Sequence, residues 1–410
     1  MRLTSKINVL KTAESLAVFH LISLSVGFAL YHTLLINNLI PPFLGGYFGV
    51  FTALSLITML PFLTLFLTKT AKSSPYFLLL SFFAFLNVLV VTSLFSYYNG
   101  IFNDAVKQSY EVLIYWITFS LLGFFFVLAD KRKTQKVFLI FTLFYLLYII
   151  YFIATEGRIM LDFGSSDDFD RDVVSGYQGI ARSFLIIAVI ATVFIKNRIN
   201  AIFAALIFSF ILFVVGARSE FYGFVGAVLL FHSILSFKYK SSFVAIAILL
   251  STTVFLGIYY FNELMESRQL QVLDLSSSSS WVARQDMQEF ALNQISQNPI
   301  IGEFGGHVKY HSIGTYAHNA LSGYVNYGLL FFILYMLTII SIFANSTYAL
   351  IKNTSSKEWA LSFMFSFIVL FLVVTAKPVF WPITYLAMGI YLGAKYLSYT
   401  KKVAFNESHK

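Results

Sequence analysis

The chain has 410 residues, of which 58% are hydrophobic and only 11% are charged, and its mean hydropathy is +0.78. Soluble globular domains carry about 25% charged residues, so this composition excludes a soluble globular protein. The chain contains no cysteine, which excludes disulfides and thiolate-ligated zinc or iron–sulfur sites. The composition therefore predicts an all-α, polytopic membrane protein.

Apolar runs follow one another along the whole chain, and most are long enough for a membrane-spanning helix. They lie near 15–35, 45–67, 75–95, 111–129, 137–154, 180–195, 201–216, 221–237, 243–261, 318–343, 360–376 and 383–398. No small-residue cleavage site follows the first run, so we expect an uncleaved helix and not a signal peptide. The pattern predicts one integral membrane domain over residues 1–410 with about 12 transmembrane helices.

The basic residues orient these helices. If the N-terminus is cytoplasmic, 19 of the 28 Lys and Arg residues fall in inside segments and 9 fall outside, as the positive-inside rule requires. Both termini are then cytoplasmic. The net charge of +9 is explained by membrane topology, and we expect no nucleic-acid partner.

The same orientation places two longer loops outside, at about 155–179 and 262–317, the second with short amphipathic helices. ATP and nucleotide sugars are absent from that side, so a substrate must arrive activated or attached to a lipid. The first loop contains Asp167-Asp168-Phe169-Asp170, a D-x-D pattern. Metal binding is one interpretation, but a solvated acidic loop is the favoured one, and we predict no metal site.

Two arginines on the outside are candidates for binding an anion. Arg218 lies in a short turn between two apolar runs, where it could instead snorkel to lipid headgroups or pair with Glu220. Arg284 lies on a helix expected to start at a Ser280 N-cap and to end near Gln297. Two guanidinium groups can hold a diphosphate bidentately and stay charged at any relevant pH.

His318 is the third candidate, at the expected start of the tenth run. A histidine there can act as a general base, a hydrogen-bond donor or a structural cap. His307 and His311 have a spacing that could suit zinc, but the glycine-rich segment before them argues against a continuous helix, and we do not predict a zinc site. The expected substrate-binding residues are Tyr177, Gln178, Arg182, Glu220, Tyr316 and Asn319.

A set of short motifs connects these candidates. In chain order they are Gly216-Ala217-Arg218-Ser219, Arg284, Asn298-Pro299-Ile300-Ile301-Gly302, Ala317-His318-Asn319, and Gly328 ten residues further on. This order resembles the superfamily of O-antigen polymerases (Wzy-type) and O-antigen ligases, which are polytopic GT-C glycosyltransferases of the bacterial inner membrane. The motifs cover roughly residues 200–345, and the predicted helix count and loop layout extend the resemblance to the whole chain.

The resemblance implies a donor glycan on undecaprenyl diphosphate, which is transferred with inversion on the periplasmic face without metal or other cofactor. Arg218 and Arg284 match the family's diphosphate-binding arginines, and His318 matches a histidine near the transfer site. Further implied partners are the lipid bilayer, a chain-length regulator and a flippase. Polymerase and ligase differ in the acceptor, which is another lipid-linked repeat unit or lipid A core.

We favour the polymerase by analogy, because the 155–179 loop is elaborated as well as the larger one. A lipid-linked oligosaccharide flippase or another 12-span transporter is the rival class. Against it, the link between the sixth and seventh runs is short, whereas facilitators usually have a long central cytoplasmic loop. A non-catalytic scaffold would leave the outward Arg218 and Arg284 without a role.

Overall fold

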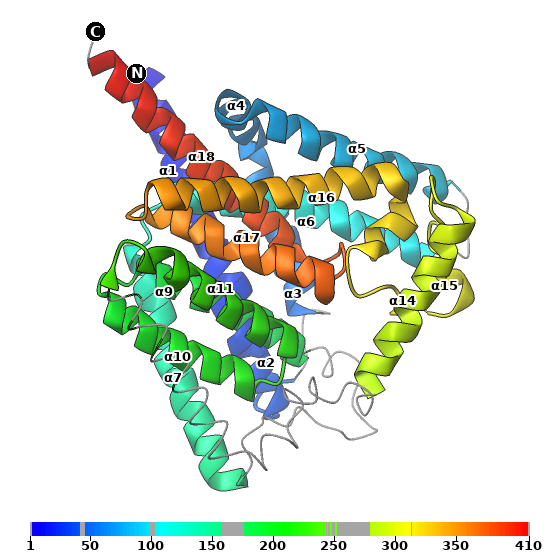
Figure 1. The fold of residues 1–410 in the computed structure, drawn as a ribbon, viewed down its shortest axis with the longest axis horizontal. Coiled ribbons are helices and arrows are strands. Elements are labelled where there is room, and N and C mark those ends of the chain that lie inside the picture. The colour runs from blue at the N-terminus through cyan, green and yellow to red at the C-terminus, as the bar shows by residue number, and fades with distance from the viewer. Residues whose placement is uncertain are drawn as a thin grey trace.

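The computed structural model describes residues 2–41, 46–97, 103–157, 176–240, 279–312 and 314–408, with the single positions 242, 244, 247 and 251. All regular elements in these ranges are helices (Figure 1). Nine of the helices in this part of the chain are long and apolar enough to cross a membrane. This confirms an all-helical, multi-pass membrane protein, while the count of twelve spans stays a prediction.

The predicted runs correspond to described helices except 243–261, most of which lies outside the described residues. The elements of the first part are α1 (Arg2–Ile22), the π-helical turn η1 (Ser23–Gly27), α2 (Phe28–Ile36), α3 (Tyr47–Met59), the 3₁₀ turn η2 (Leu60–Phe62), α4 (Leu63–Ser73), α5 (Pro75–Ser96), α6 (Asn103–Leu128) and α7 (Arg132–Glu156). They are followed by α9 (Gly176–Phe194), α10 (Arg198–Val214), α11 (Arg218–Ser236), α14 (Ser279–Gln297), α15 (Gly306–Tyr310), α16 (Leu321–Lys352), α17 (Lys357–Thr375) and α18 (Pro382–Ser408).

Helix α18 packs closely against α6. All residues from Pro382 to Ala394 are buried, so this part of α18 contacts protein and not lipid. A side chain at Gly123 of α6 or at Gly389 of α18 would collide with the backbone of the other helix. Small residues allow such close packing between membrane helices, where dispersion forces replace the hydrophobic effect. This burial explains why α18 needs less apolar character than the helices that face lipid.

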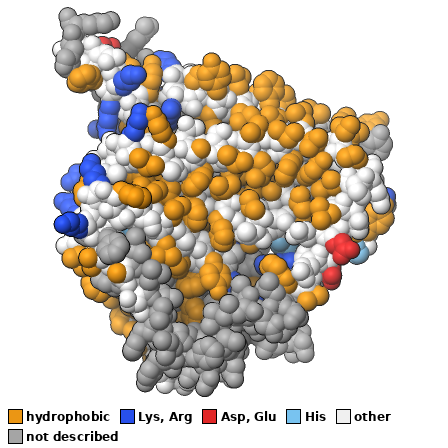
Figure 2. Space-filling model, in the orientation of Figure 1, with side chains coloured by type: hydrophobic (Ala, Val, Ile, Leu, Met, Phe, Trp, Pro, Cys, Tyr) orange, Lys and Arg blue, Asp and Glu red, His pale blue; other side chains and the backbone are white. Residues whose placement is uncertain are grey.

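One end of the bundle holds both chain termini. Lys131, just after α6, interacts electrostatically with Glu14 of α1, Glu358 of α17 and Lys401 of α18. Figure 1 shows N and C near each other at this end. Figure 2 shows Lys and Arg side chains gathered there, while hydrophobic side chains cover the face over α5 and α16. We call it the terminal end and the opposite end the site end. The cytoplasmic location of the terminal end stays a prediction.

At the site end, two glycines bring the turn before α15 against α16. Helix α16 bends at Gly328 (φ 80°, ψ 178°), and the N–H of Leu329 donates to the carbonyl of Ile300 at 3.0 Å. Gly302 also has a positive φ of 76°, and a Cβ there would collide with the carbonyl of Val325. The Asn-Pro-Ile-Ile-Gly motif and the glycine ten residues after His318 thus meet in space, and both serve backbone packing.

We expect Gly328→Ala to lower the melting temperature of the purified protein in detergent. The added Cβ would lie 2.7 Å from the carbonyl oxygen of Ile300, and the positive φ alone costs about 1–3 kcal/mol for a residue other than glycine. Gly314→Ala is the control, because a Cβ at Gly314 meets no atom within 4 Å. Equal melting temperatures for the two variants would contradict this account of the motif.

Candidate functional site

Charged and aromatic side chains from distant parts of the chain meet at the site end. His318 interacts electrostatically with Arg284 and Lys377, and Lys377 forms an ion pair with Glu220. Arg182 interacts with Glu220 and Tyr115, and Glu111 interacts with Tyr115 and Tyr316. The ring of Tyr316 packs against that of His318, with 5.1 Å between the centroids. These contacts link eight residues, which we call the polar cluster: Glu111, Tyr115, Arg182, Glu220, Arg284, Tyr316, His318 and Lys377.

The ion pair in this cluster is almost completely buried. The Nζ of Lys377 lies 2.5 Å from Oε1 of Glu220, and the two side chains are 11% and 1% exposed. The hydroxyl of Ser219 donates to the other carboxylate oxygen at 2.7 Å. Glu220 was predicted to bind substrate or to pair with Arg218, but its carboxylate is occupied by Lys377. Lys377 is one of the nine Lys and Arg residues on the outside in the predicted topology and was not among the candidates, although an outside lysine runs against the positive-inside preference.

His318 lies in the segment that precedes α16 and interacts electrostatically with two cations, Arg284 and Lys377. The helix begins at Leu321, so the prediction that His318 begins it is wrong. Asn319 supplies a hydrogen bond at the start of the helix, because its side-chain oxygen accepts the N–H of Leu321 at 3.0 Å. Burial lowers the pKa of His318 to about 4, and Arg284 and Lys377 add to this effect. The imidazole is therefore neutral at pH 7.

Arg284 is on the face of α14 that packs against the rest of the protein. Residues at helical spacing on this face, among them Arg284, Met287 and Ala291, are partly or fully buried. The helix ends at Gln297 as predicted, its first described residue is Ser279, and the expected Ser280 N-cap stays a prediction. The side chain of Asn319 bonds to Gln288 at 3.5 Å, which ties α14 to the His318 segment.

Arg218 is the first residue of α11 and is partly buried. It interacts electrostatically with Tyr222 and precedes Glu220 by two residues, which places it beside the polar cluster. The helix start predicted at this turn is confirmed. Joint binding of one diphosphate by Arg218 and Arg284 stays a prediction.

Arg182 is held between aromatic rings. Its guanidinium carbon lies 3.6 Å from the ring centroid of Phe48 and 5.3 Å from that of Phe28. Such cation–π contacts fix a guanidinium without neutralising it. Tyr177 and Gln178, one turn earlier on α9, form a hydrogen bond of 3.1 Å with each other. Binding of substrate by Tyr177 and Gln178 stays a prediction.

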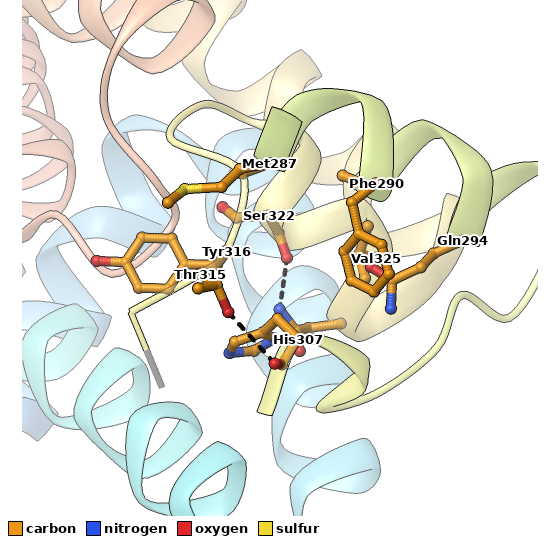
Figure 3. Close-up of a pocket in the computed structure, with 11 residues that line it drawn as sticks. Met287, Phe290, Gln294, His307, Thr315, Tyr316, Ser322 and Val325 are labelled. Carbon is orange, nitrogen blue, oxygen red and sulfur yellow. Dashed lines mark hydrogen bonds between the residues drawn. The ribbon is translucent and has the colours of Figure 1, made fainter. Parts of the chain in front are cut away.

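A small cavity of about 10 Å³ lies beside the polar cluster, lined by residues of α14, α15 and α16 and by Tyr316 (Figure 3). It has room for about one water molecule. His307 lines it, is 2% exposed, and its Nε2 bonds to Oε1 of Gln108 at 3.1 Å. Because an amide oxygen only accepts, Nε2 carries the proton. Tyr316 packs edge-on against His307, so this buried histidine supports the ring that also contacts His318.

His307 and His311 have the spacing of a possible metal site, but the part of the chain that the structure describes brings no third ligand to them. In the described ranges there is no group of three or more His, Cys, Asp or Glu side chains that could hold a metal ion. His311 is exposed and packs edge-on against Phe290, with 4.8 Å between ring centroids. The acidic motif Asp167–Asp170 lies outside the described residues, as do residues 158–175 of the first loop and residues 262–278 of the second.

The protein should lose stability as the pH falls, in part through His307. Burial lowers the pKa of His307 to about 4 from its usual 6.5, so the unfolded state takes up a proton first as the pH drops below 6.5. We expect this residue alone to cost about 2 kcal/mol of unfolding free energy by pH 5, with no effect above pH 7. Thermal unfolding in detergent at pH 7.5 and 5 should show a smaller acid shift for His307→Gln, and identical shifts would contradict the prediction.

A scan of the chain against protein-family models finds no match, and a search of curated proteins finds none either. The functional interpretation therefore depends on the motifs and on the geometry of the polar cluster.

Proposed function

We propose that this protein is a GT-C glycosyltransferase of the bacterial inner membrane, which polymerises oligosaccharide repeat units on the periplasmic face. Its substrates are undecaprenyl-diphosphate-linked oligosaccharides, as donor and as acceptor. The observation that supports this most is that His318 has two cationic neighbours, Arg284 and Lys377, at the end of the bundle opposite the termini. A lipid-linked diphosphate is the anion that reaches such a depth.

In the proposed reaction, a hydroxyl of the acceptor sugar attacks the anomeric carbon of the donor. The bond from that carbon to the phosphate oxygen breaks, and the lipid diphosphate leaves with the electron pair, which inverts the anomeric centre. Negative charge grows on the leaving group, and Arg218, Arg284 and Lys377 offset it more strongly in the transition state than in the ground state. His318 accepts the hydroxyl proton or orients the substrates. No metal takes part in these steps.

Two alternatives use the same features differently. A ligase would transfer the glycan to lipid A core, and the polar cluster contains nothing that separates it from a polymerase. A lipid-linked oligosaccharide flippase or other transporter would need polar groups near the middle of the membrane. The cluster at the site end favours an enzyme over a transporter. A chain-length regulator and a flippase are the protein partners that we propose.

Glycan transfer by the purified protein tests this proposal. We expect a ladder of lipid-linked products from an undecaprenyl-diphosphate repeat unit, and its loss in His318→Ala. His311→Ala is the matched control, because His311 is an exposed histidine of the same loop. Transfer only after addition of lipid A core would identify the ligase. Absence of glycan transfer with both acceptors would contradict the proposed enzymatic function. Movement of the glycolipid across liposome membranes would then identify a transporter.

A further inference from the structure

The first turns of α6 carry a polar stripe on a helix whose remaining part is almost entirely apolar. Gln108, Glu111 and Tyr115 recur at helical spacing, and Gln108 and Tyr115 are half-buried while Glu111 is exposed. Residues between them, such as Ser109 and Val112, are buried. Residues three or four apart lie on one face of a helix, so the three side chains point to the same side.

Two residues of this stripe, Glu111 and Tyr115, belong to the polar cluster, and Gln108 connects to it through His307. Gln108 bonds to His307, which supports Tyr316. Glu111 interacts electrostatically with Tyr316 and Tyr115. Tyr316 is thus a shared neighbour of Glu111 and His318.

The two carboxylates of the cluster, Glu220 and Glu111, differ in whether they are available as proton acceptors. Glu220 is buried, and Lys377 and Ser219 occupy its oxygens. Glu111 is exposed, and no lysine or arginine of the described residues forms an ion pair with it. A carboxylate in a predicted membrane-spanning helix is costly and usually serves a function.

His318 is less suited to accept a proton, because a proton on its ring would face Arg284 and Lys377. Like charges at close range disfavour the charged form of a group. The same surroundings suit a neutral imidazole that donates a hydrogen bond to a negatively charged leaving group. Arg284 and Lys377 therefore make the surroundings of His318 cationic, whereas Glu111 provides a carboxylate beside Tyr115 and Tyr316.

We propose that Glu111 is the general base of the transfer reaction and that Tyr115 and Tyr316 line the acceptor sugar subsite. This inference rests on the proposed function. As the acceptor oxygen bonds to the anomeric carbon, its proton passes to the Glu111 carboxylate. The bond to the phosphate oxygen breaks, and the lipid diphosphate leaves on the side of His318, Arg284 and Lys377. The aromatic rings offer flat apolar faces on which a sugar ring can stack.

The test compares Glu111→Gln with wild type in the transfer assay and measures binding of the lipid diphosphate donor separately. We expect transfer to fall by about 100-fold or more, because positioned bases contribute at least this much, while the donor Kd stays within about twofold. Asp104→Asn is the matched control. Asp104 is an acidic residue two turns earlier on α6 that pairs with Lys107 at 3.3 Å, and its variant should keep full activity.

Addition of formate to Glu111→Ala separates a catalytic from a structural role. Formate restores a carboxylate in the vacated space, so we expect it to raise transfer by this variant and to leave Glu111→Gln unchanged. Lost transfer without rescue, or lost donor binding, would make Glu111 a structural residue and overturn the proposal. Full activity of Glu111→Gln would overturn it as well and leave the proposed function intact. An inactive wild type would instead refute the proposed function.

Discussion

Lys377→Met is expected to lower the free energy of unfolding by about 3–5 kcal/mol, the usual effect of removing one partner of a buried ion pair. Glu220 is 1% exposed, so without Lys377 its charge would stay buried with no counter-ion. The hydroxyl of Ser219 compensates only part of this cost. Chemical and thermal unfolding in detergent and lipid would measure the loss.

The double variant Lys377→Met with Glu220→Leu distinguishes a lost pair from lost packing. It removes both charges, so we expect it to be more stable than Lys377→Met alone and close to wild type. If the single variant is as stable as wild type, or if the double variant is the least stable of the set, the ion pair is not the stabilising feature that the geometry indicates.

Arg284→Ala is expected to reduce glycan transfer by about 100-fold to 1000-fold, as the loss of a group that stabilises transition-state charge does elsewhere. Arg284→Lys should keep part of the activity, because a lysine keeps the charge but loses the bidentate geometry. Removal of Arg284 also removes one of the groups that hold the pKa of His318 down, so that pKa should rise above about 4. Histidine NMR signals would report this shift.

The control for this variant is Arg132→Ala. Arg132 is an exposed arginine at the terminal end, where it pairs with Asp130 at 3.2 Å. It should keep full transfer activity. Equal activity of Arg284→Ala and Arg132→Ala, with both proteins folded, would remove Arg284 from the proposed mechanism.

The sequence predicted the helices well, because membrane helices must be continuous apolar segments that satisfy their own backbone. It predicted their ends less well. The apolar run predicted helix α6 from residue 111, but the helix begins at Asn103. The prediction missed the first turns because Asp104, Lys107 and Gln108 lower the local hydropathy. Glu111 is therefore the first residue of the expected run, and it was not among the candidate residues.

The candidate site was only partly accessible from sequence. Arg284 and His318 belong to recognisable motifs, and the structure brings them together with Lys377. Lys377 belongs to no motif, and its partner Glu220 is far away in the chain. Likewise, Gln108 and His307 are far apart in the chain, and no local sequence pattern relates them. Such pairs are created by helix packing, which a pattern along one chain does not contain.

The close packing of α18 against α6 also has a consequence for biogenesis. An isolated α18 would partition into the bilayer less favourably than α5 or α7, because it is less apolar than these two helices. Its residues from Pro382 to Ala394 need a protein surface, and α6 provides that surface earlier in synthesis. During translation, the surface of α6 around Gly123 therefore stays uncovered until α18 is made.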